Sequence, residues 1–145
     1  MNEQSDVFEP RNDIERQLLA AQAGERSAEA FMEDLLAAQL FMPVEEDSTG
    51  IKGLQKSTQA RPLTLESEDG LQVLILFTSP ERAKRFVAEV PGDYGGGLLA
   101  DFSWILQRVG SGVAIAINPG WSAGIDLDPE TVQQLRARVD AEVDE

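Results

Sequence analysis

Residues Leu71 to Phe86 read LQVLILFTSPERAKRF, and this stretch decides the fold class. Its apolar half predicts a buried strand that ends near Phe77. Ser79 then stands where it can cap a helix whose first position is Pro80, because a proline ring needs no N–H there. A buried strand that leads directly into a helix is typical of a sheet covered by helices.

The same two patterns extend along the chain in both directions. Helical spacing of apolar residues predicts helices over 12–23, 27–40, 80–89, 98–109 and 128–139, and short alternating or apolar runs predict strands over 40–44, 62–66, 71–77, 113–117 and 125–127. Asn12 and Ser27 are expected to cap the first two helices, Leu98 to face the core from the fourth, and Asp69-Gly70 to form a hairpin turn. The expected fold is α/β (α+β): a single domain with a mixed four- to five-stranded sheet and helices packed against it. We expect a disordered acidic lead over 1–10, the domain over 11–140 and an acidic tail over 141–145.

The net charge of −14 is unevenly distributed. Residues 1–47 hold twelve acidic and three basic side chains, residues 140–145 hold four acidic and no basic ones, and the segment between them holds ten acidic and nine basic. Nucleic acid and anionic membrane are therefore not expected as partners, since both require clustered Lys and Arg. A basic protein is the natural complement, although acidic ends also serve solubility alone, and the two interpretations stay open.

Histidine and cysteine are absent from the chain. Their absence excludes a Ser-His-Asp triad, a cysteine nucleophile and the usual zinc sites. The acidic, polar N-terminus does not resemble a signal or transit peptide, and no apolar run approaches the roughly 18 residues of a membrane span. We therefore expect a cytoplasmic protein that is not an enzyme and carries no cofactor or metal.

Two acidic clusters carry oxygen ligands of the kind that metal sites use. Glu45, Glu46 and Asp47 offer hard oxygen ligands, and we interpret them as part of a partner-binding surface. The D-x-D-x-E spacing over 126–130 resembles a metal loop, but Asp128 stands at a helix start and no EF-hand pattern follows. Helix capping is the favoured interpretation of Asp128.

Aromatic residues on loops are the other candidates for contact with a partner. Tyr94 precedes a glycine run, 95–97, which lacks the lysine of a phosphate-binding loop and is interpreted as a hinge or loose binding loop. Trp121 closes a turn, Asn118-Pro119-Gly120-Trp121, that suits type II. Trp121 is interpreted either as an interface anchor or as a cover for the end of the sheet.

Several of these stretches together resemble one family. Phe77-Thr78-Ser79 after one strand and Asn118-Pro119-Gly120 after another are similar to the N-terminal domain of the SseB family (enhanced serine sensitivity protein). The early helices, with Phe31, Leu35 and Leu40 before Pro43, fit the same pattern, as do Gly124, Leu127 and Leu135 near the end. The resemblance covers about residues 14–138. It implies an α/β domain without established catalytic residues, here as a stand-alone version, and loose links to serine sensitivity and type III secretion.

Three functions follow in order of preference. The first is a non-enzymatic protein-binding module, most concretely an acidic immunity or inhibitor protein, or a secretion accessory, that binds a basic protein through Glu45, Glu46, Asp47, Tyr94 and Trp121. The second is a regulatory domain that binds an amino acid or nucleotide at the strand ends, with Thr78, Ser79 and Asn118 as ligand contacts. The third is an enzyme that uses carboxylates and a divalent metal.

Overall fold

The computed structural model describes residues 9–45, 61–90, 94 and 96–143. In chain order the elements are α1 (Asp13–Gln22), α2 (Ala28–Leu36), β1 (Gln39–Glu45), β2 (Arg61–Pro62), β3 (Thr64–Glu66), β4 (Gln72–Leu76), α3 (Pro80–Val87), β5 (Gly96–Asp101), α4 (Phe102–Arg108), β6 (Val113–Ile117), β7 (Ile125–Leu127) and α5 (Pro129–Val143). Most of the expected acidic lead, residues 1–8, and residues 144–145 of the expected tail lie outside the described residues. The helix α5 extends into the expected tail as far as Val143.

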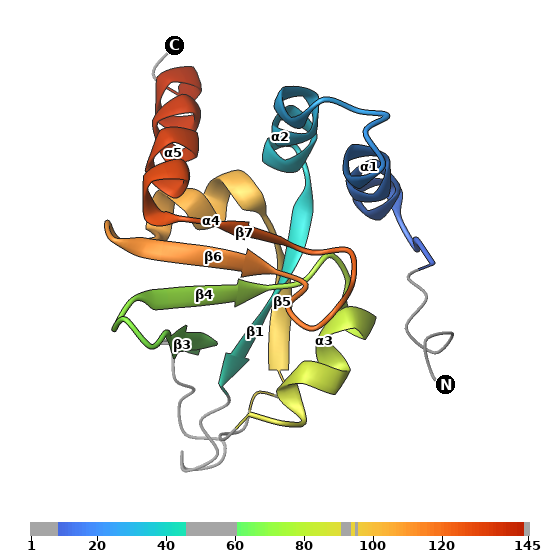
Figure 1. The fold of residues 1–145 in the computed structure, drawn as a ribbon. Helices are drawn as coiled ribbons and strands as arrows, with labels where there is room; N and C mark the ends of the chain where they lie inside the picture. Colours follow the sequence, from blue (N-terminus) through green and yellow to red (C-terminus); the bar gives the residue numbers. More distant parts are fainter. Residues whose placement is uncertain (1–8, 46–60, 91–93, 95, 144–145) are drawn as a thin grey trace, which may run out of the picture.

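The strands form two sheets. One is a mixed four-stranded sheet in the order β3-β4-β6-β7, in which only β4 and β6 run parallel. The other is a three-stranded antiparallel sheet in the order β2-β1-β5, which runs steeply across the direction of β4 and β6 (Figure 1). The α/β single-domain prediction is confirmed, and the mixed sheet has the expected size. The second sheet was not anticipated.

The two sheets meet at Phe41 of β1. Its N–H donates to the Phe77 carbonyl at 2.7 Å, and the Phe77 N–H donates to the Phe41 carbonyl at 2.9 Å. Leu63 forms a second connection, because its N–H donates to the Pro43 carbonyl while its own carbonyl accepts from the Ile75 N–H. The predicted strand over 62–66 is therefore divided at Leu63 between β2 and β3.

Alternation along β4 and β6 separates two apolar cores. Leu74, Leu76, Ile115 and Ile117 face the larger core, which α1, α2, α4 and α5 cover. Ile75, Phe77 and Ala116 face the smaller core beneath α3, together with partly buried residues that include Phe86 and Tyr94. Figure 1 shows α3 on one side of the mixed sheet and the other four helices gathered on the opposite side.

Three helices begin with a side-chain N-cap, as predicted. The Asn12 Oδ1 accepts from the Glu15 N–H at 3.0 Å, the Ser27 Oγ accepts from the Ala30 N–H at 3.0 Å, and the Asp128 Oδ1 accepts from the Thr131 N–H at 2.8 Å. Each bond satisfies one of the N–H groups that a helix start leaves without a partner.

The predicted helix over 98–109 was wrong in its first turn. Residues up to Asp101 belong to β5, and the helix begins only at Phe102. Gly96 and Gly97, expected as part of a hinge, also lie in β5. The ring of Phe41 covers Gly97 so closely that an added Cβ would lie 2.3 Å from its Cζ, so the glycine here allows a close contact between strands.

Candidate functional site

Two strand ends, after β4 and after β6, are joined by a buried polar contact. The Thr78 N–H donates to Asn118 Oδ1 at 3.0 Å, and Asn118 Nδ2 donates to Thr78 Oγ1 at 2.9 Å and to the Ala123 carbonyl at 3.1 Å. Asn118 is fully buried and has a φ of 59°, a left-handed conformation that asparagine tolerates better than most residues. The type II turn after it is confirmed, with Gly120 at φ 87° and the Trp121 N–H donating to the Asn118 carbonyl.

A buried ion pair extends this contact to α1 and α3. The carboxylate of Glu15 accepts from Arg82 Nε at 3.1 Å, from Arg82 Nη2 at 2.9 Å, from Thr78 Oγ1 at 2.5 Å and from the Arg11 N–H at 2.8 Å. Glu15 has no exposed surface, and Arg82 keeps 4% of its own. Burial favours protonation of Glu15, but the bonds from Arg82, Thr78 and Arg11 outweigh it and lower the pKa of Glu15.

Trp121 completes the cluster on the side of α3. Its indole Nε1 donates to the Arg82 carbonyl at 3.0 Å, and the guanidinium carbons of Arg82 and Arg85 lie 4.7 and 4.3 Å from the ring centroid. The ring also packs against the larger core. These contacts fit the interpretation of Trp121 as a cover for the end of the sheet, while its role as an interface anchor stays a prediction.

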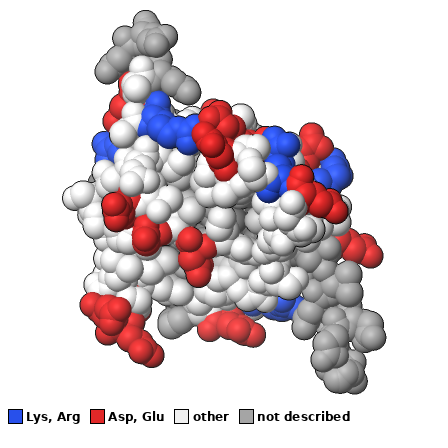
Figure 2. Space-filling model, turned by 45° about the horizontal axis from the view of Figure 1, so that its top comes forward, with Lys and Arg blue, Asp and Glu red and all other residues white. Residues whose placement is uncertain are grey.

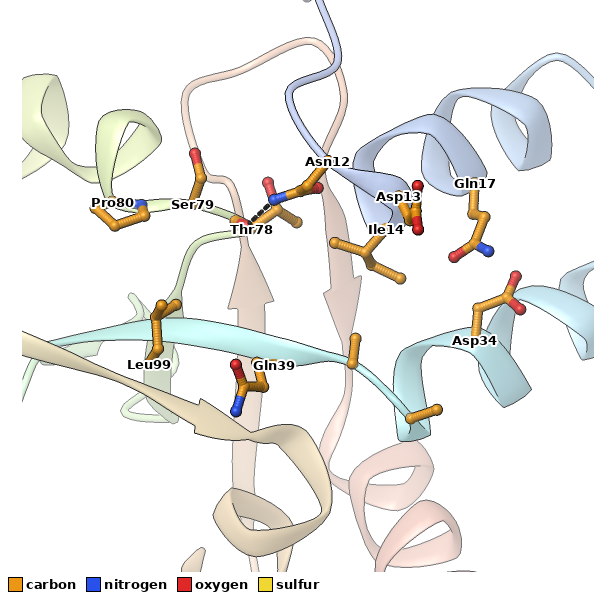
Figure 3. Close-up of a pocket in the computed structure, with 12 residues that line it drawn as sticks. Asn12, Asp13, Ile14, Gln17, Asp34, Gln39, Thr78, Ser79, Pro80 and Leu99 are labelled. Atoms are coloured by element: carbon orange, nitrogen blue, oxygen red, sulfur yellow. Dashed lines mark hydrogen bonds between the residues drawn. The ribbon is translucent and has the colours of Figure 1, made fainter.

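Ser79 does not make the capping bond predicted for it. It occupies the N-cap position of α3, but its side chain makes no capping hydrogen bond. Its Oγ is buried and has no hydrogen-bond partner within the described part of the chain. In Figure 3 this hydroxyl points away from Gln39 and Leu99. The N–H of Arg82, which such a cap could bond, donates instead to the Ser79 carbonyl at 3.1 Å.

Beside these residues lies a hollow of about 510 Å³, the α1–β5 cavity. Its wall includes Thr78, Ser79 and Pro80 on one side and Asn12, Asp13, Gln17, Asp34, Gln39 and Leu99 on the others (Figure 3). The polar atoms of Thr78 are paired with protein groups: Asn12 Nδ2 donates to the Thr78 carbonyl at 2.8 Å, and Asn118 holds the N–H. Ligand binding by Thr78, Ser79 and Asn118 therefore stays a prediction, with the cavity as its place.

A second hollow, the α4 groove, has a volume of about 660 Å³ and mostly apolar walls. Met42, Leu74, Leu98, Trp104, Ile105 and Val109 line it. Trp104 is 39% exposed and Leu98 37%, and the Arg108 guanidinium carbon lies 3.9 Å from the Trp104 ring centroid. Leu98 was expected to face the core from a helix, and this was wrong because residue 98 belongs to β5.

Of the predicted partner-binding residues, the structure describes Glu45, Tyr94 and Trp121, and these three lie in different settings. Glu45 ends β1, while Glu46 and Asp47 lie outside the described residues. Tyr94 packs against the smaller core and Trp121 against the larger one. Within the described ranges, no group of three or more acidic side chains could hold a metal ion.

Acidic side chains are scattered over the helical face and do not form one patch. Figure 2 shows them dispersed among uncharged residues, with basic side chains along one rim next to acidic ones. Several acids on this face pair with arginines: Asp13 with Arg16, Asp34 with Arg26, and Glu33 with Arg138. On this face the acidic side chains therefore do not mark one binding patch.

Sequence reasoning missed the ion pair and the exposed leucines. Glu15 shares a helical face with the apolar Leu18 and Leu19, and Arg82 shares one with Phe86, so each charge lies within an apolar stripe. That position was the available signal for a buried pair. For β5, the signal was the adjacent Leu98 and Leu99 between a glycine pair and an aspartate.

Comparison with known protein families shows to which family the chain is related. Residues 14–134 match the family described as SseB protein N-terminal domain. The chain belongs to this family. The stretches that carried the resemblance meet in space, since Thr78 and Asn118 bond each other and an added Cβ at Gly124 would lie 2.8 Å from the Asn118 and Ile117 carbonyl oxygens.

This SseB domain matched nothing in a comparison with curated proteins or in one with solved structures. None of the helices in the described ranges has the length and apolar character needed to cross a bilayer.

Proposed function

We propose that this SseB domain is a non-enzymatic module that binds a basic protein partner. The observation that carries the proposal is the exposure of Leu98 and Trp104 beside the α4 groove, where they could enter a contact. Large apolar side chains at the mouth of an apolar hollow are typical of protein-binding surfaces, and tryptophan is frequent among the residues that dominate such contacts.

The net charge of the chain indicates which charge its partner should carry. At −14 the chain attracts basic proteins and accelerates their association, and it repels acidic ones. Because acids are dispersed over the helical face, this attraction acts on the approach of the partner, whereas the apolar groove supplies the close contact. The affinity should therefore depend on salt mainly through the association rate.

The lack of histidine and cysteine supports a role without catalysis. In its most concrete form the module is an immunity or inhibitor protein that neutralises a basic toxin or enzyme in the cytoplasm. A secretion accessory that escorts a basic cargo is the sister version. The two differ in what happens to the bound partner, which loses activity in the first case and is exported in the second.

The test uses the immobilised full chain and a native lysate. Trp104→Asp places a charge in the groove, and Gln134→Asp places the same charge on an exposed position of α5 as the control. We expect the wild type and the control to capture the same basic protein, and Trp104→Asp to lose it. Capture of chaperones alone, at low and high salt alike, or equal capture by both variants contradicts the proposal.

The α1–β5 cavity favours a second candidate, a regulatory domain for an amino acid or nucleotide. Its support is the position of Thr78 and Ser79 in the wall of a hollow of about 510 Å³, a suitable size for a small ligand. Thermal-shift screening against metabolites tests it, because a ligand that binds the folded state raises the melting temperature. A screen without any stabilising metabolite counts against this candidate.

A further inference from the structure

The strand β5 is an exposed edge of the three-stranded sheet. It pairs with β1 on one side and is followed by α4, and Gly97, Leu98, Leu99 and Asp101 are all exposed. Leu99 is 52% exposed, more than any other large apolar side chain in the described part of the chain. An edge strand with exposed apolar side chains is a template on which another strand can pair.

The pairing of β1 fixes which backbone groups of β5 face outward. The N–H and carbonyl of Phe41 bond to Phe77, so these two backbone groups point away from Leu99, which lies opposite Phe41 on β5. In an antiparallel pair, the residue opposite such a position also directs its N–H and carbonyl outward. The same holds for Gly97, opposite Pro43, whose carbonyl serves Leu63. Within the described residues these outward groups of Gly97 and Leu99 have no hydrogen-bond partner.

The other sheet edges are short. Among the described strands, β2 has two residues and includes a proline, and β3 and β7 have three residues each, with Glu66 and Asp126 exposed. Short length, proline and charge are the usual protections of an edge. By contrast β5 has six residues, no proline and no lysine, and its single charge is at its last residue. Among the sheet edges that the structure describes, β5 is thus the one without such protection.

The two faces of β5 differ in chemistry. Leu98 lines the apolar α4 groove, whereas Leu99 lines the α1–β5 cavity together with Asp13 and Asp34. Asp101 lies two residues from Leu99, hence on the same face, and is exposed. Asp13 and Asp34 pair with Arg16 and Arg26, so the acidic group that remains on this face is the exposed carboxylate of Asp101. A strand added to β5 would therefore place alternate side chains against an apolar face and against a polar face that carries this carboxylate.

We propose that β5 binds an extended segment of a basic protein by strand addition, with apolar side chains toward Leu98 and Trp104 and Lys or Arg side chains toward Leu99 and Asp101. The inference rests on the proposed function and specifies its mode of recognition. Backbone hydrogen bonds supply the affinity in this mode, and the alternating side chains supply the specificity. A second copy of the chain is a poor occupant, because two chains of charge −14 repel each other.

The experiment selects random displayed peptides of roughly ten residues on the full chain and then measures the most enriched peptide as a synthetic one. Leu99→Pro removes the outward N–H, and a proline is tolerated at such an edge position. Leu99→Ala is the matched control, because it removes the side chain and keeps the N–H. A melting curve for each variant checks that it folds.

We expect enriched peptides that alternate apolar and basic residues and slow the amide exchange of Gly97 and Leu99. Leu99→Pro should weaken binding about tenfold more than Leu99→Ala, since the peptide carbonyl is left without its donor. A copy of the peptide with N-methylated backbone on the facing residues should bind equally weakly to all three proteins.

Four outcomes overturn strand addition: no enrichment, enriched peptides without the alternation, equal losses for the two Leu99 variants, or a dimer that forms through β5 at low salt. Peptides that require Trp104 but ignore the Leu99 backbone refute strand addition and leave the proposed function intact. If neither Trp104→Asp nor Leu99→Pro changes capture of a partner, the proposed function fails as well.

Discussion

Breaking the buried pair of Glu15 and Arg82 should cost the domain a large part of its stability. In Glu15→Gln the charge of Arg82 stays buried without its counterion. The new amide N–H₂ group is itself a donor, yet it faces N–H donors that bonded to the carboxylate. The carboxylate accepts four hydrogen bonds from charged or polar donors, and each such bond to a charged group contributes about 1.5–3 kcal/mol. The glutamine keeps some of them, so we expect a loss of about 3–5 kcal/mol, as for other broken buried pairs.

The measurement is urea denaturation followed by circular dichroism at pH 7. Domains of this kind have an unfolding free energy of about 5–15 kcal/mol, so the predicted loss should lower the urea midpoint by a large fraction, and a thermal melt should show a melting temperature lower by roughly 10 °C. Asp13→Asn is the matched control. It removes an acid from the same helical turn, but the Asp13–Arg16 pair is exposed and contributes at most about 1 kcal/mol.

Acid should remove the difference between wild type and Glu15→Gln. The pKa of Glu15 is lowered in the folded state, so the carboxylate stabilises the fold above its ordinary pKa of 4.5, and this contribution disappears as the pH falls through the folded value. A double variant, Glu15→Met with Arg82→Met, should recover part of the single-variant loss. A loss below about 1 kcal/mol for Glu15→Gln, or strictly additive losses in the double variant, refutes this account of the pair.

Four further substitutions test individual local contacts. Gly124→Ala forces a Cβ against backbone carbonyls that cannot move aside, and calorimetry should show a loss of about 1–3 kcal/mol. Ser79→Ala removes a buried hydroxyl that bonds to none of the described residues and should leave the urea midpoint unchanged or raised, whereas Ser27→Ala removes a real cap and should cost about 1 kcal/mol. Asp128→Ala should destabilise at neutral pH and less in acid. Hydrogen bonds from Thr131 lower the pKa of Asp128, so its contribution holds above its ordinary pKa and is lost as the pH falls through the lowered one.

Features with a local cause were predictable from sequence. The caps at Asn12, Ser27 and Asp128 and the turn glycines Gly70 and Gly120 each follow from one residue and its immediate neighbours, and the structure has all five. Ser79 was the exception. A serine before Pro80 satisfies the capping pattern, but the pattern does not say whether the side chain reaches a free N–H.

The strand β5 could not be predicted because its cause lies elsewhere in the chain. Leu98, Leu99 and Ala100 are good helix formers, and their apolar pattern runs on smoothly into α4. Pairing with β1, about 60 residues earlier, holds them extended. Because the helical interpretation placed Leu98 in the core, the exposed edge strand and its possible role in binding were not predicted.

The polar cluster was out of reach for a similar reason. Glu15 and Arg82 are 67 residues apart, and Thr78 and Asn118 are 40 apart. Sequence alone assigns Asn12 and Asn118 only local roles, as a capping residue and a turn residue, and both roles are real. Their second role, contact between distant segments, depends on a topology that becomes visible only when the strands are in place.

Leu63 has a mechanical consequence for the whole fold. Its N–H donates to β1 and its carbonyl accepts from β4. If Leu63 followed a one-residue shift of either strand, its hydrogen bond to the other strand would break. A slip would also turn this side chain, 1% exposed, out of the smaller core. Leu63 thus couples the two sheets mechanically. A force that pulls on β5 would reach the four-stranded sheet through the backbone hydrogen bonds of this residue.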